Sequence, residues 1–371
     1  MGEVEVVVVG GGAMGSAAAW QLARRGAGVV VLEQYRPGHT QGGSHGSSRI
    51  IRLAYRDPFY VDLAAAALHQ WDLLEDEAGE RLRVVTGVVD HGDRPTVDGL
   101  AATLTAQGHP VEWLSAREAG LRWPGLAFEE PVLHQPRGGR ADADRTVAAL
   151  QRLAAEHGAE IRHDARVEAI TPQAGAVEVR TADGGMRARQ VVVAAGAWAP
   201  GLVGTLVPMP ELTVTVEQPA HFRPREWSDP WPSFIHHQRD AATRTGVSPR
   251  GAFGLASPDG VKVGLHAVGP VVDPDTDRSD PDPARVRELQ DYVAHWVPGV
   301  DPATAVPQPC LYDLTDSSDF VLDRVGQLTI AAGFSGHGFK FTPEIGRMVA
   351  DLVLGGGAVP DRFRLSAHRR G

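Results

Sequence analysis

Short runs of β-branched residues alternate with helical patterns at the start of the chain. Residues 3–9 form an apolar run bounded by glycines, which predicts a buried strand. A helical pattern follows over 13–25 and ends at Gly26, where glycine can adopt the left-handed conformation that stops a helix. A second apolar run over 28–32 completes a strand–helix–strand unit. This unit predicts the beginning of a parallel sheet.

Further elements of both kinds are spread over the rest of the chain. Helices are predicted at 57–79, where Asp57 and Pro58 suit the first positions, at 144–158, and at 343–354, where Thr342 suits the N-cap. Strands are predicted at 160–162, 166–170, 191–195 and 327–332, with an alternating, antiparallel strand within 260–268. Residues 206–232 are proline-rich and interrupted, which favours a crossover between domains.

A glycine-rich fingerprint lies between the first strand and the first helix. Gly10 allows a tight turn, Gly12 lets the backbone approach a pyrophosphate, and Gly15 lets the helix pack against the strand. Glu33 ends the second strand, where an acid can bind ribose hydroxyls and disfavours NADP. The alternative is a tight turn without a ligand, and the pattern alone does not distinguish FAD from NAD.

The strands that suit a dinucleotide-binding sheet come from the start, middle and end of the chain. We therefore predict an α/β fold in which a Rossmann-like domain with a parallel sheet is intertwined with a second, α+β domain built on an antiparallel sheet. The first domain is expected to comprise 1–82, 141–206 and 312–371, and the second 83–140 and 207–311.

Composition excludes several classes of function. With 371 residues, 43% of them hydrophobic, the chain can bury two cores, and its net charge of −10 argues against a nucleic-acid groove. An anionic substrate would then need a local cationic site. No apolar run suits a membrane span, no basic leader precedes the first strand, and a single cysteine, Cys310, excludes an intramolecular disulfide. We expect a cytoplasmic protein without a membrane or nucleic-acid partner.

Other chemistry finds no support in the motifs. No histidine and cysteine pair has zinc spacing, and His236 and His237 are neighbours that would point to opposite sides of a strand. The chain lacks a Walker loop and a hydrolase nucleophile elbow. No metal site is expected.

Four motifs resemble those of one flavoprotein family. They occur in the family's order over nearly the whole chain, as GSHGSSRIIR at 43–52, KVGLH at 262–266, PCLY at 309–312 and GFSGHGFKF at 333–341. The chain is similar to the monomeric sarcosine oxidase group of the D-amino-acid-oxidase-like flavoproteins. That group also includes N-methyltryptophan, fructosyl-amino-acid and pipecolate oxidases.

The resemblance implies FAD in the first domain, attached through a cysteine thioether at Cys310, whereas a lone cysteine by itself is more often a small buried hydrophobe. It implies that Arg49 and Arg52 lie on opposite faces of the flavin and that Lys262 lies over the ring and promotes reaction with O2. Without the resemblance, both arginines would suit a surface and Lys262 a half-solvated strand. Lys262 and His266 share one strand face because their spacing is two full periods.

The resemblance further implies that Arg52 and Lys340 grip the substrate carboxylate. The remaining implied site residues are His266, Tyr312 and Phe253 in the substrate pocket, His45 near the flavin edge, and Ser44, Gly336, His337 and Lys340 at the cofactor. Phe253 stands where the family usually has an aromatic hydroxyl, and residues 234–246 are more polar than the family's pocket lid. Both departures put the identity of the amine in doubt.

We therefore predict a monomeric oxidase of a small secondary or N-methyl amino acid, which yields an imine and passes electrons to O2 to form hydrogen peroxide. A fructosyl-amino-acid oxidase and a pipecolate or proline oxidase are alternatives within the class. An NAD-dependent dehydrogenase and a non-catalytic flavin-binding subunit are alternatives outside it.

Overall fold

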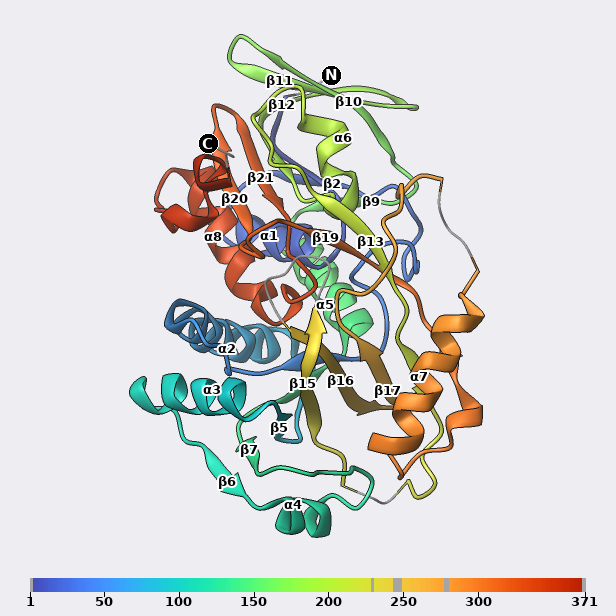
Figure 1. Cartoon of the computed structure of the whole chain (residues 1–371). Helices are drawn as coiled ribbons and strands as arrows, with labels where there is room; N and C mark the ends of the chain where they lie inside the picture. The colour runs from blue at the N-terminus through green and yellow to red at the C-terminus, as the bar shows by residue number, and fades with distance from the viewer. Residues whose placement is uncertain (1–2, 228–229, 243–248, 277–279, 369–371) are drawn as a thin grey trace.

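The computed structural model describes residues 3–227, 230–242, 249–276 and 280–368, with the backbone alone for 239–242 and 249–250. It has two large sheets, each in its own half of the molecule (Figure 1). This is the α/β fold that the sequence predicts.

The first sheet has eight strands and a parallel centre in the order β21-β12-β1-β2-β9. Antiparallel strands β10, β11 and β20 extend it. Its members are β1 (Val4–Val9), β2 (Val29–Leu32), β9 (Glu160–Arg162), β10 (Val167–Gln173), β11 (Ala176–Thr181), β12 (Gly184–Val193), β20 (Val321–Val325) and β21 (Leu328–Ala332). Three distant segments therefore build one sheet, as the scattered apolar runs predict.

The second sheet also has eight strands, in the order β18-β14-β17-β16-β15-β5-β7-β6. Its members are β5 (Val88–Gly92), β6 (Glu112–Leu114), β7 (Val132–Gln135), β14 (Ala220–Phe222), β15 (Ser233–Ala242), β16 (Pro249–Ser257), β17 (Gly260–Leu265) and β18 (Val306–Pro307). The sheet is antiparallel except that β15 pairs in parallel with β5. The sheet is therefore mixed rather than purely antiparallel, and its parallel pair joins strands from segments far apart in the chain.

Two small sheets and eight α-helices complete the fold of the residues that the structure describes. β3 (Arg49–Ile51), β8 (Gly139–Ala141) and β4 (Arg83–Val85) form one small sheet, and β13 (Thr213–Glu217) pairs with β19 (Cys310–Leu314) in the other. The helices are α1 (Ala13–Ala23), α2 (Pro58–Ala78), α3 (Arg94–Ala106), α4 (Ala116–Arg122), α5 (Ala143–Glu156), α6 (Ala199–Val203), α7 (Pro283–Trp296) and α8 (Thr342–Leu354). The predicted crossover at 206–232 thus contains β13 and β14. The residue bounds of the two domains stay a prediction.

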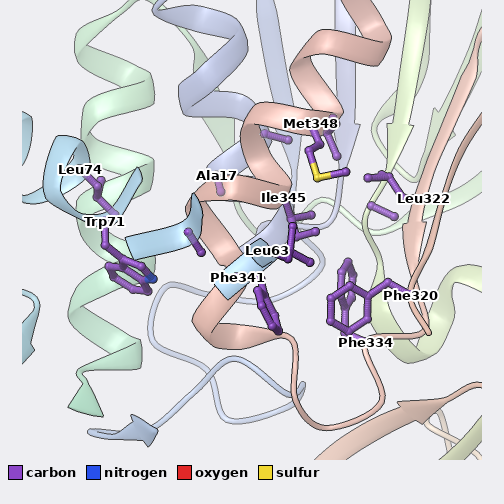
Figure 2. Close-up of a cluster of buried hydrophobic side chains, with 14 of the residues drawn as sticks. Ala17, Leu63, Trp71, Leu74, Phe320, Leu322, Phe334, Phe341, Ile345 and Met348 are labelled. Atoms are coloured by element: carbon purple, nitrogen blue, oxygen red, sulfur yellow. The ribbon is translucent and has the colours of Figure 1, made fainter. Parts of the chain in front are cut away.

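The first sheet buries alternate residues on its two faces. Val6, Val8 and Val31 pack with α1, α2, α5 and α8, whereas Val7 and Val30 pack on the side of β10, β11 and α6. Helix α8 approaches α1 so closely that a Cβ at Gly346 would collide with Ala17. The apolar cluster between α1, α2 and α8, shown in Figure 2, holds the start of α8 in place.

The predicted N-cap at Thr342 is wrong. Thr342 is the first residue of α8, and a 3-10 turn, Phe339–Phe341, leads directly into the helix. Phe341 takes the N-cap position in a helical conformation, so no extended residue is available whose side chain could fold back on the first turn. The Thr342 hydroxyl is buried without a hydrogen-bond partner in the part of the chain that the structure describes.

Candidate active site

A single large cavity reaches from the glycine-rich turn to the start of α8. Its volume is about 1520 Å³, and residues of both large sheets line it. Pockets for drug-sized ligands occupy roughly 300–1,000 Å³. The cavity therefore has room for a ligand as large as a dinucleotide together with a small second molecule.

The dinucleotide end is built from backbone geometry. Gly10 has φ +102°, and a Cβ on Gly15 would overlap the Gly10 carbonyl oxygen. The Ser44 hydroxyl accepts a hydrogen bond from Ala13 N–H at 3.0 Å, so a side chain from a distant loop caps α1, whose own N-cap Gly12 has none to offer. The positive end of α1 therefore lies at the cavity wall, which suits phosphate.

Glu33 is 6% exposed at the end of β2. One carboxylate oxygen accepts from Gly11 N–H at 2.7 Å and the other from Tyr35 N–H at 2.9 Å. Glu33 therefore ties the glycine-rich turn to the loop after β2. Its predicted contact with a ribose is not tested by these bonds and stays a prediction.

The loop after the dinucleotide turn fits an additional polar ligand. Within the described residues, the hydroxyls of Ser47 and Ser48 are buried without a hydrogen-bond partner. Burial and the positive charges of Arg49 and Lys262 lower the pKa of His45 to about 3. Unpaired buried polar atoms are costly, so their gathering beside the cavity is an observation in favour of a bound polar group such as FAD.

Cys310, Lys262 and Arg49 line the cavity beside this loop. Lys262 is 4% exposed, its Nζ lies 3.2 Å from Gln308 Oε1, and burial together with Arg49 lowers its pKa to about 7. Cys310 is half-buried, and burial raises the pKa of its thiol while Arg49 and Lys262 act in the opposite direction. Arg49 donates to the carbonyls of Gly43, His45 and Ser48, which fixes its guanidinium.

A second cationic cluster meets at Tyr55. Lys340 Nζ donates to the Tyr55 hydroxyl at 2.9 Å and to the His337 carbonyl at 2.6 Å. The Arg52 guanidinium lies over the Tyr55 ring, 4.8 Å from its centroid, and donates to the Ala54 carbonyl. Burial and Arg52 hold the pKa of Lys340 well below its ordinary value. Two basic side chains thus face one cavity: Arg52, just after β3, and Lys340, just before α8.

The apolar core fixes Lys340 from behind. The Trp71 indole N–H donates to the Lys340 carbonyl at 2.8 Å, and Trp71 and Phe341 belong to the cluster drawn in Figure 2. Because α2 and α8 pack on the same core, they hold the backbone of Lys340 in place. Its side chain therefore enters the cavity from a rigid support.

Five further predicted site residues also line the cavity: His266, Tyr312, Phe253, Gly336 and His337. The Tyr312 ring fills the space that a Cβ on Gly336 would need. Burial lowers the pKa of His266 to about 4, with Arg52 and Lys340 adding to the effect. The structure thus brings the predicted residues to one cavity, except Gly15, which packs against Gly10 behind the cavity wall, while their individual roles stay predictions.

Sequence reasoning missed Tyr55, Asp90 and His237. Tyr55 closely follows Arg52, the last residue of the motif at 43–52, so this motif was a signal that could have pointed to Tyr55. A second signal was lysine usage, since only two of the 36 lysine and arginine residues are lysines, Lys262 and Lys340, and both line the cavity. The polar segment 234–246 lies partly outside the described residues, which end at 242 on this strand.

Within the described ranges, no helix is both long and apolar enough to span a membrane. The same residues contain no group of three or more histidine, cysteine or acidic side chains suited to a metal ion.

Comparison with known proteins identifies the family. The model of the FAD dependent oxidoreductase family matches residues 5–352. The chain is 35% identical to a monomeric sarcosine oxidase of Streptomyces avermitilis, covering 95% of this chain and 94% of the relative. It is 29% identical to an N-methyl-L-tryptophan oxidase of Yersinia pestis, covering 94% of each. NikD, an unusual amino acid oxidase essential for nikkomycin biosynthesis, superposes with a TM-score of 0.86 at 28% identity, covering 98% of this chain and 96% of that one. The chain belongs to the FAD-dependent oxidoreductase family of which these oxidases are members.

Proposed function

We propose that this protein is an FAD-dependent oxidase of a small secondary or N-methyl amino acid. The observation that carries the proposal is the pair of basic residues, partly buried Arg52 and buried Lys340, joined through Tyr55 at the end of the cavity away from the dinucleotide turn. A carboxylate is the ligand that such a pair binds best, since it accepts bonds from both. The sarcosine and N-methyltryptophan oxidases among its relatives support the substrate class.

The redox chemistry, removal of a hydride from the carbon next to the substrate nitrogen and transfer of its electrons to O2 to give hydrogen peroxide, would be supplied by bound FAD. The chain's own residues bind and orient the reactants. Arg52 and Lys340 would hold the substrate carboxylate. Lys262, beside Cys310 and Arg49, would place its positive charge near the negative charge that develops as O2 accepts electrons. The cavity walls exclude water around both groups.

Covalent attachment of FAD is the finer part of the proposal. Cys310 would form the thioether, supported by its place in the cavity beside Arg49 and Lys262, whose positive charges partly offset the rise that burial causes in the pKa of its thiol. We also propose that the protein is a cytoplasmic monomer. Sedimentation of the purified protein would test the monomer.

A panel of substrates tests the function. Hydrogen peroxide is measured with sarcosine, N-methyl amino acids, proline, pipecolate and glycated amino acids. Peroxide with the first two groups supports the proposal, whereas turnover confined to proline, pipecolate or glycated amino acids favours the alternatives within the class. A purified protein without bound flavin, even after reconstitution with FAD, would refute it.

Acid precipitation tests the covalent bond. The wild-type pellet should be yellow, and Cys310→Ala should release its flavin into the supernatant. Equal release from both proteins would contradict the thioether.

A further inference from the structure

A buried carboxylate lies behind the proposed carboxylate anchor. Asp90, on β5, is fully buried. Its Oδ1 lies 2.9 Å from His237 Nε2 and 4.0 Å from Arg52 Nη1, and its Oδ2 lies 2.6 Å from Gln135 Nε2. Since Arg52 and His237 both line the cavity, one acid connects two side chains that can face the substrate.

The hydrogen bonds around Asp90 determine which nitrogen of His237 carries the proton. Gln135 Oε1 accepts from the backbone N–H groups of Leu53 and Ala54, at 3.2 and 3.0 Å, so its NH2 group must face Asp90. A carboxylate offers only acceptors, so the hydrogen of the second bond belongs to His237 Nε2. In the neutral ring, Nδ1 is then a hydrogen-bond acceptor.

His237 is also placed where a substrate side chain would lie. On β15, Phe234 and His236 are buried, whereas Ile235 and His237 line the cavity, as expected for alternation along a strand. His237 pairs with Gly251, whose carbonyl accepts from His266 N–H at 2.8 Å, so the two histidines flank one residue. The neighbouring wall is apolar, formed by Ile235 and Phe253.

We propose that Asp90 and His237 form a dyad that recognises a hydrogen-bond donor on the substrate side chain. This inference rests on the proposed oxidase function and extends it to the substrate class. The favoured substrate is an N-methyl or secondary amino acid whose side chain carries a hydroxyl or an N–H group. Arg52 holds its carboxylate beside Asp90, and His237 Nδ1 accepts the bond from its side chain.

Asp90→Asn is the sharpest variant because it keeps the shape and reverses the polarity. The Gln135 NH2 group requires an acceptor, so the amide oxygen turns to Gln135 and its NH2 group turns to His237 Nε2. The proton of His237 then moves to Nδ1, and Nδ1 changes from acceptor to donor. Nitrogen-15 NMR of histidine-labelled protein measures this change, with the His237 signal assigned by its loss in His237→Phe. Unchanged thermal unfolding checks that both variants are folded.

The substrate pair N-methylserine and its O-methyl ether measures the consequence, since the ether accepts but does not donate. In the wild type, kcat/KM should be about tenfold higher for N-methylserine, the size of one hydrogen bond. In Asp90→Asn, that ratio should fall to about one, because both compounds can accept from Nδ1–H. His237→Phe, which offers neither a donor nor an acceptor, should also remove the preference, and adding Asp90→Asn to it should then leave the ratio unchanged. Using a ratio cancels any general effect on Arg52.

A wild-type ratio near one, an equal ratio in wild type and Asp90→Asn, or a His237 tautomer that does not change would overturn the inference. These outcomes differ from failure of the proposed function, in which none of the substrates, N-methylalanine included, is oxidised. If no substrate is oxidised, calorimetry can measure the binding of N-methylserine and of its O-methyl ether to the FAD-loaded protein. The ratio of the two affinities then tests the dyad directly.

Discussion

The two ends of the cavity are built on different principles. At the dinucleotide end, glycines, a helix terminus and a capping serine shape the backbone, and the key residues lie close together in the chain. At the substrate end, basic side chains from distant segments, Arg52 and Lys340, meet at Tyr55, and burial together with Arg52 holds the pKa of Lys340 well below its ordinary value. The first end is shaped mainly by backbone contacts, whereas the second holds charges that favour a bound anion. Substitutions should therefore affect stability at one end and activity at the other.

The largest effect on stability is expected from Gly15→Ala. The added Cβ would overlap the Gly10 carbonyl oxygen, so α1 must move away from β1. We expect the free energy of unfolding, measured with urea, to fall by about 3 kcal/mol, together with loss of FAD. Gly120→Ala in α4 is the matched control, because a Cβ there meets nothing within 4 Å. Equal stability of the two variants would show that the close approach at Gly15 is not needed.

Lys340→Met should show the opposite pattern. Loss of a charged hydrogen bond to the substrate carboxylate should raise KM by about 10- to 100-fold. The free energy of unfolding should stay the same or rise, because a buried amine beside Arg52 is replaced by an apolar chain of similar length. Steady-state kinetics and urea unfolding measure both. Arg347→Met, on the outer side of the same helix and paired with Glu344 and Asp351, should leave KM unchanged. A drop in stability with no change in KM would remove Lys340 from the binding site.

A proton titration would sharpen the comparison further. Because the chain has only two lysines, carbon-13 labelling of lysine gives two side-chain signals, assigned with Lys262→Met. In the flavin-free protein the Lys262 signal should titrate near pH 7.

The unfolded chain keeps an ordinary lysine pKa of 10.5, so it binds more protons than the folded state between pH 7 and 10.5. The contribution of Lys262 to stability should therefore rise with pH across that window, and Lys262→Met should flatten the rise. Titration of both lysines near 10.5 would contradict the burial argument.

The smallest effect is expected from Ser44→Ala. Removing the hydroxyl leaves Ala13 N–H without its acceptor at the start of α1, which should lower the free energy of unfolding by about 1 kcal/mol. FAD should stabilise wild type and variant alike if Ser44 only caps the helix, and the variant less if the hydroxyl also contacts the cofactor. Thermal unfolding with and without FAD distinguishes these outcomes.

Local patterns were sufficient for the dinucleotide end. The run of valines, the spacing of Gly10, Gly12 and Gly15, and the acid at Glu33 all lie within one strand–helix–strand unit, so neighbouring residues determine the turn. The resemblance of four motifs pointed to the remaining cavity-lining residues. Thr342 shows the limit of local rules, because the preceding turn was already helical and left no place for a cap.

The sequence by itself determined the fold class, the glycine-rich turn and the identity of the basic residues. Only the tertiary structure decided which of them meet. Tyr55 joins Arg52 and Lys340 because α8 is held against α2 by the core, and Asp90 reaches His237 because β5 pairs in parallel with β15. Long-range pairing and burial are properties of the whole packed chain, and the lowered pKa values follow from that burial, so no local pattern encodes them.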